Sequence, residues 1–142
     1  MLHQSQVLHI ILLNYSTNND DSYQINYFVR YQNNMKEIIY NFLKTIPVGK
    51  VVTYGQIGEY LGNKKLARVV GNILHTNPDP IKYPCYKVVN SKGELAKNFG
   101  DIGGIETQKQ RLEKDGIEVK YYKVDLKKYQ WSFNNEKRIR NS

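Results

Sequence analysis

Two short helical patterns separated by a glycine turn constrain the fold of this chain more than any other feature, and both lie within residues 51–77. Thr53 is suited to cap the first helix, and Gly62-Asn63 ends it. The second pattern has an apolar side made of Leu66, Val69, Val70, Ile73 and Leu74 and a basic, polar side made of Lys64, Lys65, Arg68 and Asn72. This arrangement is typical of a helix-turn-helix, and an ordinary helical hairpin with a solvated basic face explains it equally well.

Further helices are predicted on both sides of this pair. Apolar side chains recur at i, i+3, i+4 and i+7 across residues 35–46, and Pro47 with Gly49 ends that helix. Residues 103–115 predict another helix, which stops at Gly116. Its inward side comprises Ile105, Gln108, Leu112 and Asp115. The overall expectation is an α+β, mostly helical fold.

The β-structure is expected in short pieces. Prolines exclude a helix from residues 77–84, and residues 86–89 and 94–96 flank the turn at 90–93 as a small hairpin. Strands at residues 7–13 and 23–31 would form a reduced N-terminal β segment.

These elements predict a division of the chain into three parts. The N-terminal β segment covers residues 1–34, and the main domain covers residues 35–131. Residues 132–142 are a basic tail whose last part is expected to be disordered, while Trp131 and Phe133 dock on the core.

Composition limits the classes of function. The chain has 142 residues, enough for one domain, and its one cysteine excludes an internal disulfide and a cysteine-based zinc site. The three histidines lack metal-ligand spacing, so we expect no metal and no cofactor. The apolar run at residues 7–13 is too short to cross a bilayer and lacks the flanks of a signal peptide. We therefore expect a reducing compartment, the cytoplasm or a nucleus.

The charge balance points to a polyanion. A formal net charge of +8 makes nucleic acid the first candidate partner. The single thiol, Cys85, lies in the segment YPCYKVV. Taken alone, it fits an inert buried residue or a nucleophile in thiolate form.

Several motifs resemble one family when they are read together. TYGQIGEYLG, ARVVGNIL, NPDPI, PCYKVV and GG…LEKDG follow one another with near-constant spacing within residues 35–131. This series resembles the O6-alkylguanine-DNA alkyltransferases, also called methylated-DNA–protein-cysteine methyltransferases. The resemblance implies a monomeric, winged-helix-like DNA repair protein with no membrane association. Such a protein binds duplex DNA containing O6-alkylguanine through the minor groove, flips the nucleotide out and transfers the alkyl group irreversibly to its cysteine.

The resemblance also implies roles for individual residues. Cys85 would accept the alkyl group, Arg68 would fill the gap in the base stack, and Asn77 would brace the turn before the active site. Tyr54 would rotate the nucleotide and hydrogen-bond the base, whose amino group would donate to the carbonyls of Cys85 and Val88. The expected DNA contacts are Arg68, Tyr54, Thr53, Ala67, Gly71, Asn72, Lys64 and Lys65.

One catalytic position departs from the family pattern. Tyr86 stands where the family has a histidine that relays the thiol proton through water, and Asp115 stands where that histidine has a glutamate partner. A phenol has a pKa of about 10 and is a poor base at neutral pH. We expect Tyr86 to donate a hydrogen bond to a water or to the thiolate sulfur, with its proton oriented by Asp115. A helix dipole, Lys87 and local donors would then support the thiolate.

Two alternative functions stay open. One is a lesion binder without transfer, like the alkyltransferase-like proteins, which mostly carry tryptophan at the position of Cys85. The other is a plain winged-helix DNA-binding protein.

Overall fold

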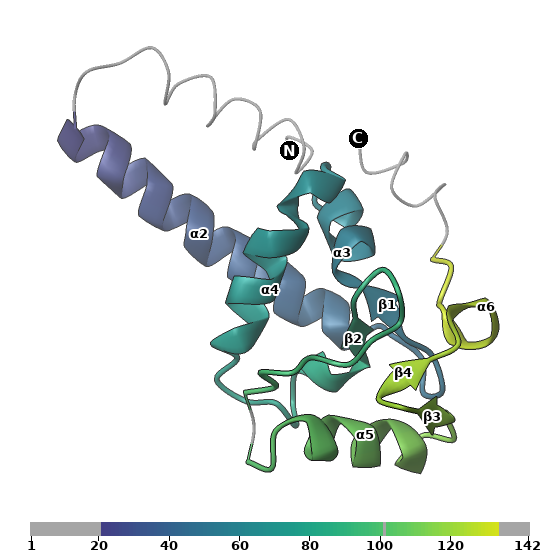
Figure 1. The fold of residues 1–142 in the computed structure, drawn as a ribbon. Coiled ribbons are helices and arrows are strands. Elements are labelled where there is room, and N and C mark those ends of the chain that lie inside the picture. Colours follow the sequence, from purple (N-terminus) through teal and green to yellow (C-terminus); the bar gives the residue numbers. More distant parts are fainter. Residues whose placement is uncertain (1–20, 101, 134–142) are drawn as a thin grey trace.

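The computed structural model describes residues 21–100 and 102–133 (Figure 1). Its helices are α2 (Asp21–Leu43), α3 (Tyr54–Tyr60), α4 (Ala67–His75), α5 (Ile105–Lys114) and α6 (Leu126–Tyr129), with the 3-10 turns η1 (Lys64–Leu66) and η2 (Cys85–Lys87). The strands are β1 (Val52–Thr53), β2 (Val88–Val89), β3 (Val119–Lys120) and β4 (Lys123–Val124). The α+β, mostly helical fold class is confirmed. Within these residues, no helix combines the length and the apolar character that crossing a bilayer requires.

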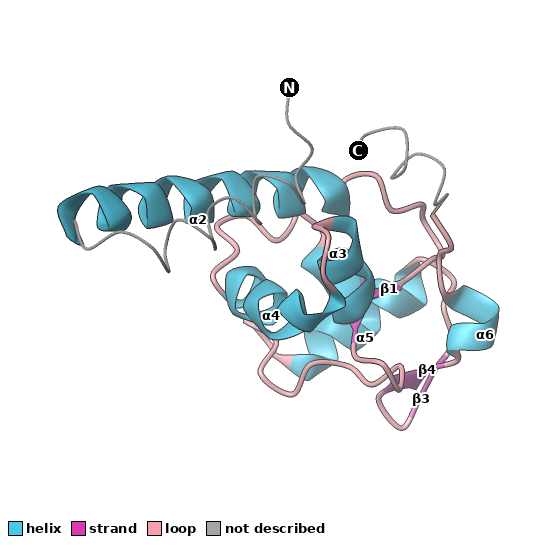
Figure 2. Cartoon of the chain, turned by 90° about the horizontal axis from the view of Figure 1, so that it is seen from above, coloured by secondary structure: helices cyan, strands magenta, loops and turns pink. Residues whose placement is uncertain are grey.

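Helix α2 corrects the N-terminal prediction. The strand expected at residues 23–31 is wrong, because this segment belongs to α2, which has 23 residues. The strand expected at residues 7–13 lies outside the described residues. Tyr31 packs against the same core as Met35 and Ile39, each four residues further along the helix. No glycine or proline interrupts α2. Extending an existing helix is easier than starting one, so the helix continues from its C-terminal half into the first half, although the aromatic and β-branched residues there favour a strand. Figures 1 and 2 show that first half projecting beyond the other described elements.

The helix-turn-helix is formed by α3, η1 and α4. Gly62 follows the last turn of α3 with a φ of 110°, the left-handed conformation expected of a residue that stops a helix. Gly58 allows the two helices to approach, because a Cβ there would lie 2.8 Å from the carbonyl oxygen of Asn63. The apolar side of α4 is narrower than predicted. Val69 is 40% exposed, because it lies off the face that buries Val70, Ile73 and Leu74.

A parallel pair of very short strands joins this motif to the cysteine segment. Val52 of β1 pairs with Val88 of β2, and Thr53 pairs with Val89. Tyr54 begins α3 directly after β1, and Cys85 begins η2 directly before β2. The pairing therefore brings the first residue of the helix-turn-helix next to the segment that carries the thiol.

The predicted hairpin, in which residues 86–89 pair with residues 94–96 across the turn at 90–93, is wrong in its pairing. The turn itself forms, since the Gly93 N–H donates to the Asn90 carbonyl at 2.9 Å. However, β2 pairs with β1, and Glu94 bridges to Lys123. Both valines of β2 are buried, which suits a strand inside the domain better than one arm of a surface hairpin. The antiparallel hairpin of the fold is β3–β4.

Two apolar clusters flank β1. The larger one packs α2 against α3, α4 and Cys85, while the smaller one contains Val51, Leu112 and Ile117. The C-terminal segment covers the larger cluster, as predicted. The rings of Trp131 and Phe133 lie 6.0 Å and 5.3 Å from the ring of Phe42, centroid to centroid. The remaining residues of the basic tail, 134–142, lie outside the described part of the chain.

The predicted N-cap gives a direct test of the motif's local stability. The Thr53 hydroxyl accepts the Gln56 N–H at 3.1 Å, and the Gln56 side chain accepts the Thr53 N–H at 2.9 Å. We expect Thr53→Ala to lower the free energy of unfolding by about 1 kcal/mol, measured by urea denaturation. The control Thr53→Ser keeps the accepting oxygen and should retain most of that stability. Equal losses in both variants would assign the effect to burial of the threonine methyl group instead.

Candidate functional site

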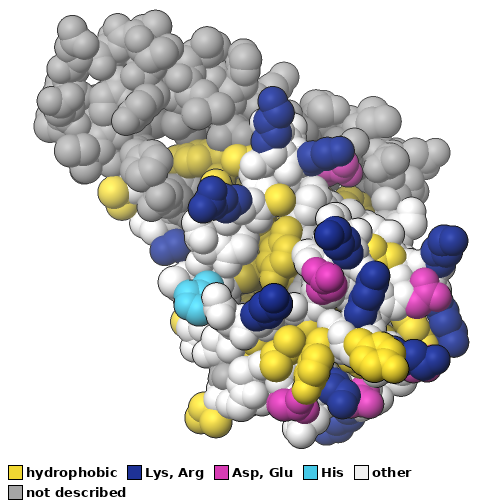
Figure 3. Space-filling model, in the orientation of Figure 1, with side chains coloured by type: hydrophobic (Ala, Val, Ile, Leu, Met, Phe, Trp, Pro, Cys, Tyr) yellow, Lys and Arg dark blue, Asp and Glu magenta, His cyan; other side chains and the backbone are white. Residues whose placement is uncertain are grey.

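A groove runs along the exposed side of the helix-turn-helix. Its volume is about 920 Å³, and it lies between the start of α3, the start of α4 and the turn at residues 90–91. It contains most of the predicted DNA-contacting set, namely Thr53, Tyr54, Lys64, Ala67, Arg68, Gly71 and Asn72. Lys65 is exposed on η1 but does not line the groove. Figure 3 shows Lys and Arg side chains spread over one face of the molecule, with hydrophobic side chains between them. The groove thus combines cations with a small-residue helix face formed by Ala67 and Gly71.

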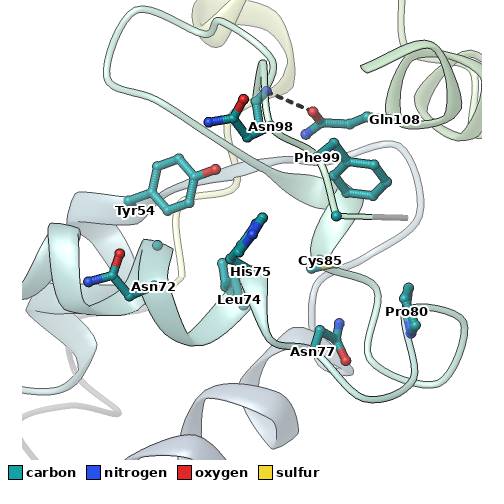
Figure 4. Close-up of a pocket in the computed structure, with 13 residues that line it drawn as sticks. Tyr54, Asn72, Leu74, His75, Asn77, Pro80, Cys85, Asn98, Phe99 and Gln108 are labelled. Atoms are coloured by element: carbon teal, nitrogen blue, oxygen red, sulfur yellow. Dashed lines mark hydrogen bonds between the residues drawn. The ribbon is translucent and has the colours of Figure 1, made fainter. Parts of the chain in front are cut away.

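A second cavity adjoins this groove and contains the thiol. Its volume is about 470 Å³, within the range of small-molecule pockets. Cys85 is only 9% exposed, yet it forms part of the cavity wall. Tyr54, Gly71 and Asn72 line both spaces. Figure 4 shows α4 on one side of this cavity and the segment carrying Asn98 and Phe99 on the other. A planar group entering from the groove would meet the sulfur inside.

Asn77 connects the end of α4 to the cysteine segment. Its side-chain N–H donates to the Tyr83 carbonyl at 2.7 Å, and its side-chain oxygen accepts the Asp79 N–H at 3.1 Å. The Cys85 N–H donates to the same Tyr83 carbonyl at 2.7 Å. One carbonyl therefore ties the helix end and the cysteine together, which is the contact that a bracing role requires.

Two tyrosines lie close enough to the thiol to interact with it electrostatically. Burial raises the pKa of Tyr54 above its ordinary value, and the nearby Cys85 raises this pKa further. Burial also raises the pKa of Tyr40, and Cys85 acts on it in the same direction. The Tyr40 hydroxyl donates to the Ile73 carbonyl at 3.2 Å, which holds it on α4. Both phenols are therefore protonated at neutral pH.

Tyr86 binds Asp115 outside the wall of the cavity that contains Cys85. Its hydroxyl donates to the Asp115 carboxylate at 2.7 Å. This contact corrects the prediction, in which the hydroxyl donates to a water or to the thiolate sulfur. Burial raises the pKa of Tyr86 far above its ordinary value, and the hydrogen bond to Asp115 and the carboxylate charge add to the rise. Neither residue lines the cavity that contains Cys85. The pair joins η2 to the end of α5, and the phenol has no proton-accepting capacity at neutral pH.

Lys87 does not support the thiolate in the way we expected. Its ammonium is buried and donates to the Ile46 carbonyl at 2.9 Å, which ties the loop after α2 to η2. Burial lowers the pKa of Lys87, while Asp115 opposes this effect. The expected helix dipole is also lacking, because Cys85 begins a 3-10 turn of three residues instead of a full α-helix.

Gln108 is a buried polar residue whose role the sequence did not reveal. Its side-chain N–H groups donate to the carbonyls of Tyr86 at 3.2 Å and Val88 at 3.0 Å, and its oxygen accepts the Ala96 N–H at 2.8 Å. The predicted base-binding carbonyl of Val88 thus already accepts one hydrogen bond, and the Cys85 carbonyl accepts one from the Val88 N–H. The inward spacing in α5 identified Gln108 as buried, but only the fold shows that it connects two walls of the cavity.

His75 and Phe99 also line the cavity and were not predicted as site residues. Phe99 lies in the long connection between α4 and α5, and His75 ends α4. They meet at the cavity because this connection folds back on α4, which sequence spacing does not reveal. Within the described residues, no group of three His, Cys, Asp or Glu side chains could hold a metal ion.

The sequence and the fold match one known family. Residues 34–117 match the family model described as 6-O-methylguanine DNA methyltransferase, DNA binding domain. The chain is 43% identical over 97 residues to a bifunctional methyltransferase/endonuclease of Picrophilus torridus, covering 68% of this chain but only 31% of that protein. It is 39% identical over 100 residues to alkyltransferase-like protein 1 of Schizosaccharomyces pombe, covering 66% of this chain and 90% of that protein. A human methylated-DNA–protein-cysteine methyltransferase is 35% identical over 86 residues, and the match spans 42% of its length.

Solved structures agree with this match. The crystal structure of the Schizosaccharomyces pombe alkyltransferase-like protein, in complex with damaged DNA containing O6-carboxymethylguanine, superposes with a TM-score of 0.64 at 34% identity. The superposition covers 70% of this chain and 96% of the Schizosaccharomyces pombe chain. A Mycobacterium tuberculosis alkyltransferase in complex with DNA superposes with a TM-score of 0.52 at 32% identity, covering 57% of this chain and 48% of that one. The chain therefore belongs to the O6-methylguanine-DNA methyltransferase family of DNA repair alkyltransferases, which includes both methyltransferases and non-catalytic alkyltransferase-like proteins.

Proposed function

We propose that this protein repairs duplex DNA by transferring an alkyl group from O6 of guanine to the sulfur of Cys85, once per molecule. One observation carries the proposal: the only cysteine of the chain opens into a cavity that shares a wall with the basic groove of the helix-turn-helix. A base stacked in a duplex cannot bring its O6 substituent to a buried sulfur. The nucleotide must therefore leave the stack and enter the cavity.

The geometry supports roles for residues of both the groove and the cavity. Arg68 lies in the groove on α4, where it would occupy the gap that the flipped guanine leaves. Tyr54 lies at the boundary between groove and cavity, and its protonated hydroxyl would donate to the base. Asn77 would hold Cys85 in place relative to α4 through their shared carbonyl.

The proposed reaction is a displacement at the alkyl carbon. The thiolate of Cys85 forms a new S–C bond while the C–O6 bond breaks, and the electron pair of that bond stays on the guanine. The guanine then takes up one proton and returns to the stack. Overall, the thiol proton is exchanged for the alkyl group, and the resulting thioether is not regenerated.

A lesion-binding protein without transfer is the second candidate. The pairing of Tyr86 with Asp115 favours it, because the position expected to relay the thiol proton is occupied by a group that does not accept one. The high coverage of the alkyltransferase-like relative agrees with this reading. The retained cysteine favours transfer.

Intact mass spectrometry distinguishes the two candidates. After incubation with duplex DNA containing O6-methylguanine, we expect the wild-type protein to gain the mass of one methyl group. Cys85→Ala should gain nothing and should still bind the lesion duplex in preference to undamaged DNA of the same sequence. A wild-type protein with lesion-selective binding and no mass gain would be a lesion binder. No mass gain together with equal affinity for damaged and undamaged duplexes would exclude both candidates.

Arg68 provides a test of nucleotide flipping. Flipping a base out of a duplex requires a few kcal/mol, so loss of the residue that fills the gap should slow methyl transfer by roughly ten- to a hundredfold. Overall affinity should fall much less in Arg68→Ala, because only one cationic contact is lost.

The matched control is Lys64→Ala, which removes another cation from the same groove. In this variant, transfer under subsaturating DNA should fall only in proportion to affinity. If Arg68→Ala behaves in the same way, Arg68 is a phosphate contact and does not fill the stack.

A further inference from the structure

Alkyl transfer to Cys85 requires a thiolate, and the residues next to the cysteine do not supply one. A cysteine thiol has an ordinary pKa of about 8.5, so it is mostly protonated at neutral pH. The Tyr86 hydroxyl donates a hydrogen bond to Asp115, and the Lys87 ammonium donates one to the Ile46 carbonyl. Neither side chain accepts a proton in this arrangement, so the residues across the cavity are the next candidates.

Three titratable side chains line this cavity in the described structure: Tyr54, His75 and Cys85. No Lys, Arg, Asp or Glu side chain is part of the described cavity wall. The phenol of Tyr54 is protonated over the whole physiological range, because its pKa is raised by burial and by Cys85. Histidine is the side chain whose ordinary pKa, about 6.5, lets it take up and release a proton near neutrality.

The position of His75 suits contact with the cavity. His75 is the last residue of α4, and Figure 4 shows its imidazole rising from the helix between Tyr54 and the Cys85 segment. The loop on the opposite side passes close to it. A Cβ at Gly100 would lie 3.2 Å from the His75 carbonyl oxygen and 3.6 Å from its ring Nδ1. A glycine at this position therefore lets the loop backbone lie against the histidine while the imidazole remains accessible to solvent.

We propose that His75 accepts the Cys85 proton through one water molecule in the cavity, and so takes the place of the histidine missing at position 86. This proposal rests on the proposed alkyl transfer. The S–H bond breaks, the proton passes through the water to the imidazole, and a thiolate–imidazolium pair forms. The thiolate then attacks the alkyl carbon, and the proton on His75 is available to the departing guanine.

His75 ends α4, and no Lys, Arg, Asp or Glu side chain is among the described residues that line the cavity with it. Asn98 is a polar residue of the cavity wall that can hold a bridging water by hydrogen bonds. Tyr40, which packs on α4 from α2, is neutral at the pH values concerned.

Because Cys85 is the only cysteine, its ionisation can be measured without DNA. The rate of Cys85 alkylation by iodoacetamide, followed by mass spectrometry as a function of pH, reports the fraction of thiolate. In the wild-type protein we expect an inflection below about pH 8, because a neighbouring acceptor lowers the apparent pKa of the thiol. In His75→Gln the inflection should move to about pH 8.5, the ordinary value for a cysteine.

His75 is exposed, so its replacement should leave the fold intact, and the thermal unfolding midpoint checks this. The control Lys127→Gln removes a cation from exposed α6 and should leave the iodoacetamide profile unchanged. Superimposable profiles for wild type and His75→Gln would overturn the proposal.

The DNA reaction separates this proposal from the proposed function. We expect His75→Gln to lower the rate of methyl transfer at pH 7 by roughly threefold or more, since a larger thiolate fraction outweighs the lower nucleophilicity of a more acidic thiol. This deficit should shrink as the pH approaches 9. If the iodoacetamide profile shifts but no methyl group is transferred, the histidine–cysteine pair exists and the repair function is wrong. If methyl transfer occurs with superimposable profiles, repair stands and His75 is not the acceptor.

Discussion

The pairing of β1 with β2 is the contact on which the site depends. Two strands of two residues each, paired in parallel, place Tyr54 and Cys85 on adjacent segments although they are far apart in sequence. All four residues of the two strands are buried. Their hydrogen bonds are therefore protected from water, and the strands lie between two apolar clusters. The groove of the helix-turn-helix and the cavity of the thiol therefore meet at Tyr54, which lines both.

The substitution of tyrosine at position 86 changes what this part of the site does. A histidine there would take part in proton transfer, whereas Tyr86 and Asp115 form a neutral donor–carboxylate pair that links η2 to α5. Lys87 makes a similar structural link to the loop after α2. The two residues that follow Cys85 in η2 thus fix its position by hydrogen bonds to residues that do not line the cavity. In the proposed reaction, activation of the thiol would therefore come from a side chain across the cavity, because Tyr86 and Lys87 are engaged elsewhere.

Much of the site was predictable from sequence where the signal is local. The cap at Thr53, the stop at Gly62 and the inward side of α5 follow from short-range patterns, and each was confirmed. The strand predicted at residues 23–31 failed locally, because this segment continues helix α2. The other failures occurred where pairing over long distances decides the outcome. The valines of β2 fit a hairpin equally well in sequence, and only the location of β1 selects the parallel partner. The contact of Lys87 with Ile46 and the position of His75 in the cavity depend on that same packing, so no spacing rule could identify them.

A thiolate that works beside DNA has to form in the field of the phosphates. That field favours cations and opposes anions, so an isolated thiol would ionise less readily once the duplex is bound. Transfer of a proton from cysteine to a histidine in the same cavity leaves the total charge of the cavity unchanged. The phosphate field then disfavours the thiolate but favours the imidazolium, so the two effects oppose each other. The excess of positive charge in the chain, +8 overall, offsets part of the remaining field. An acceptor within the cavity thus keeps the thiol reactive in the bound complex, which is the state in which the proposed reaction takes place.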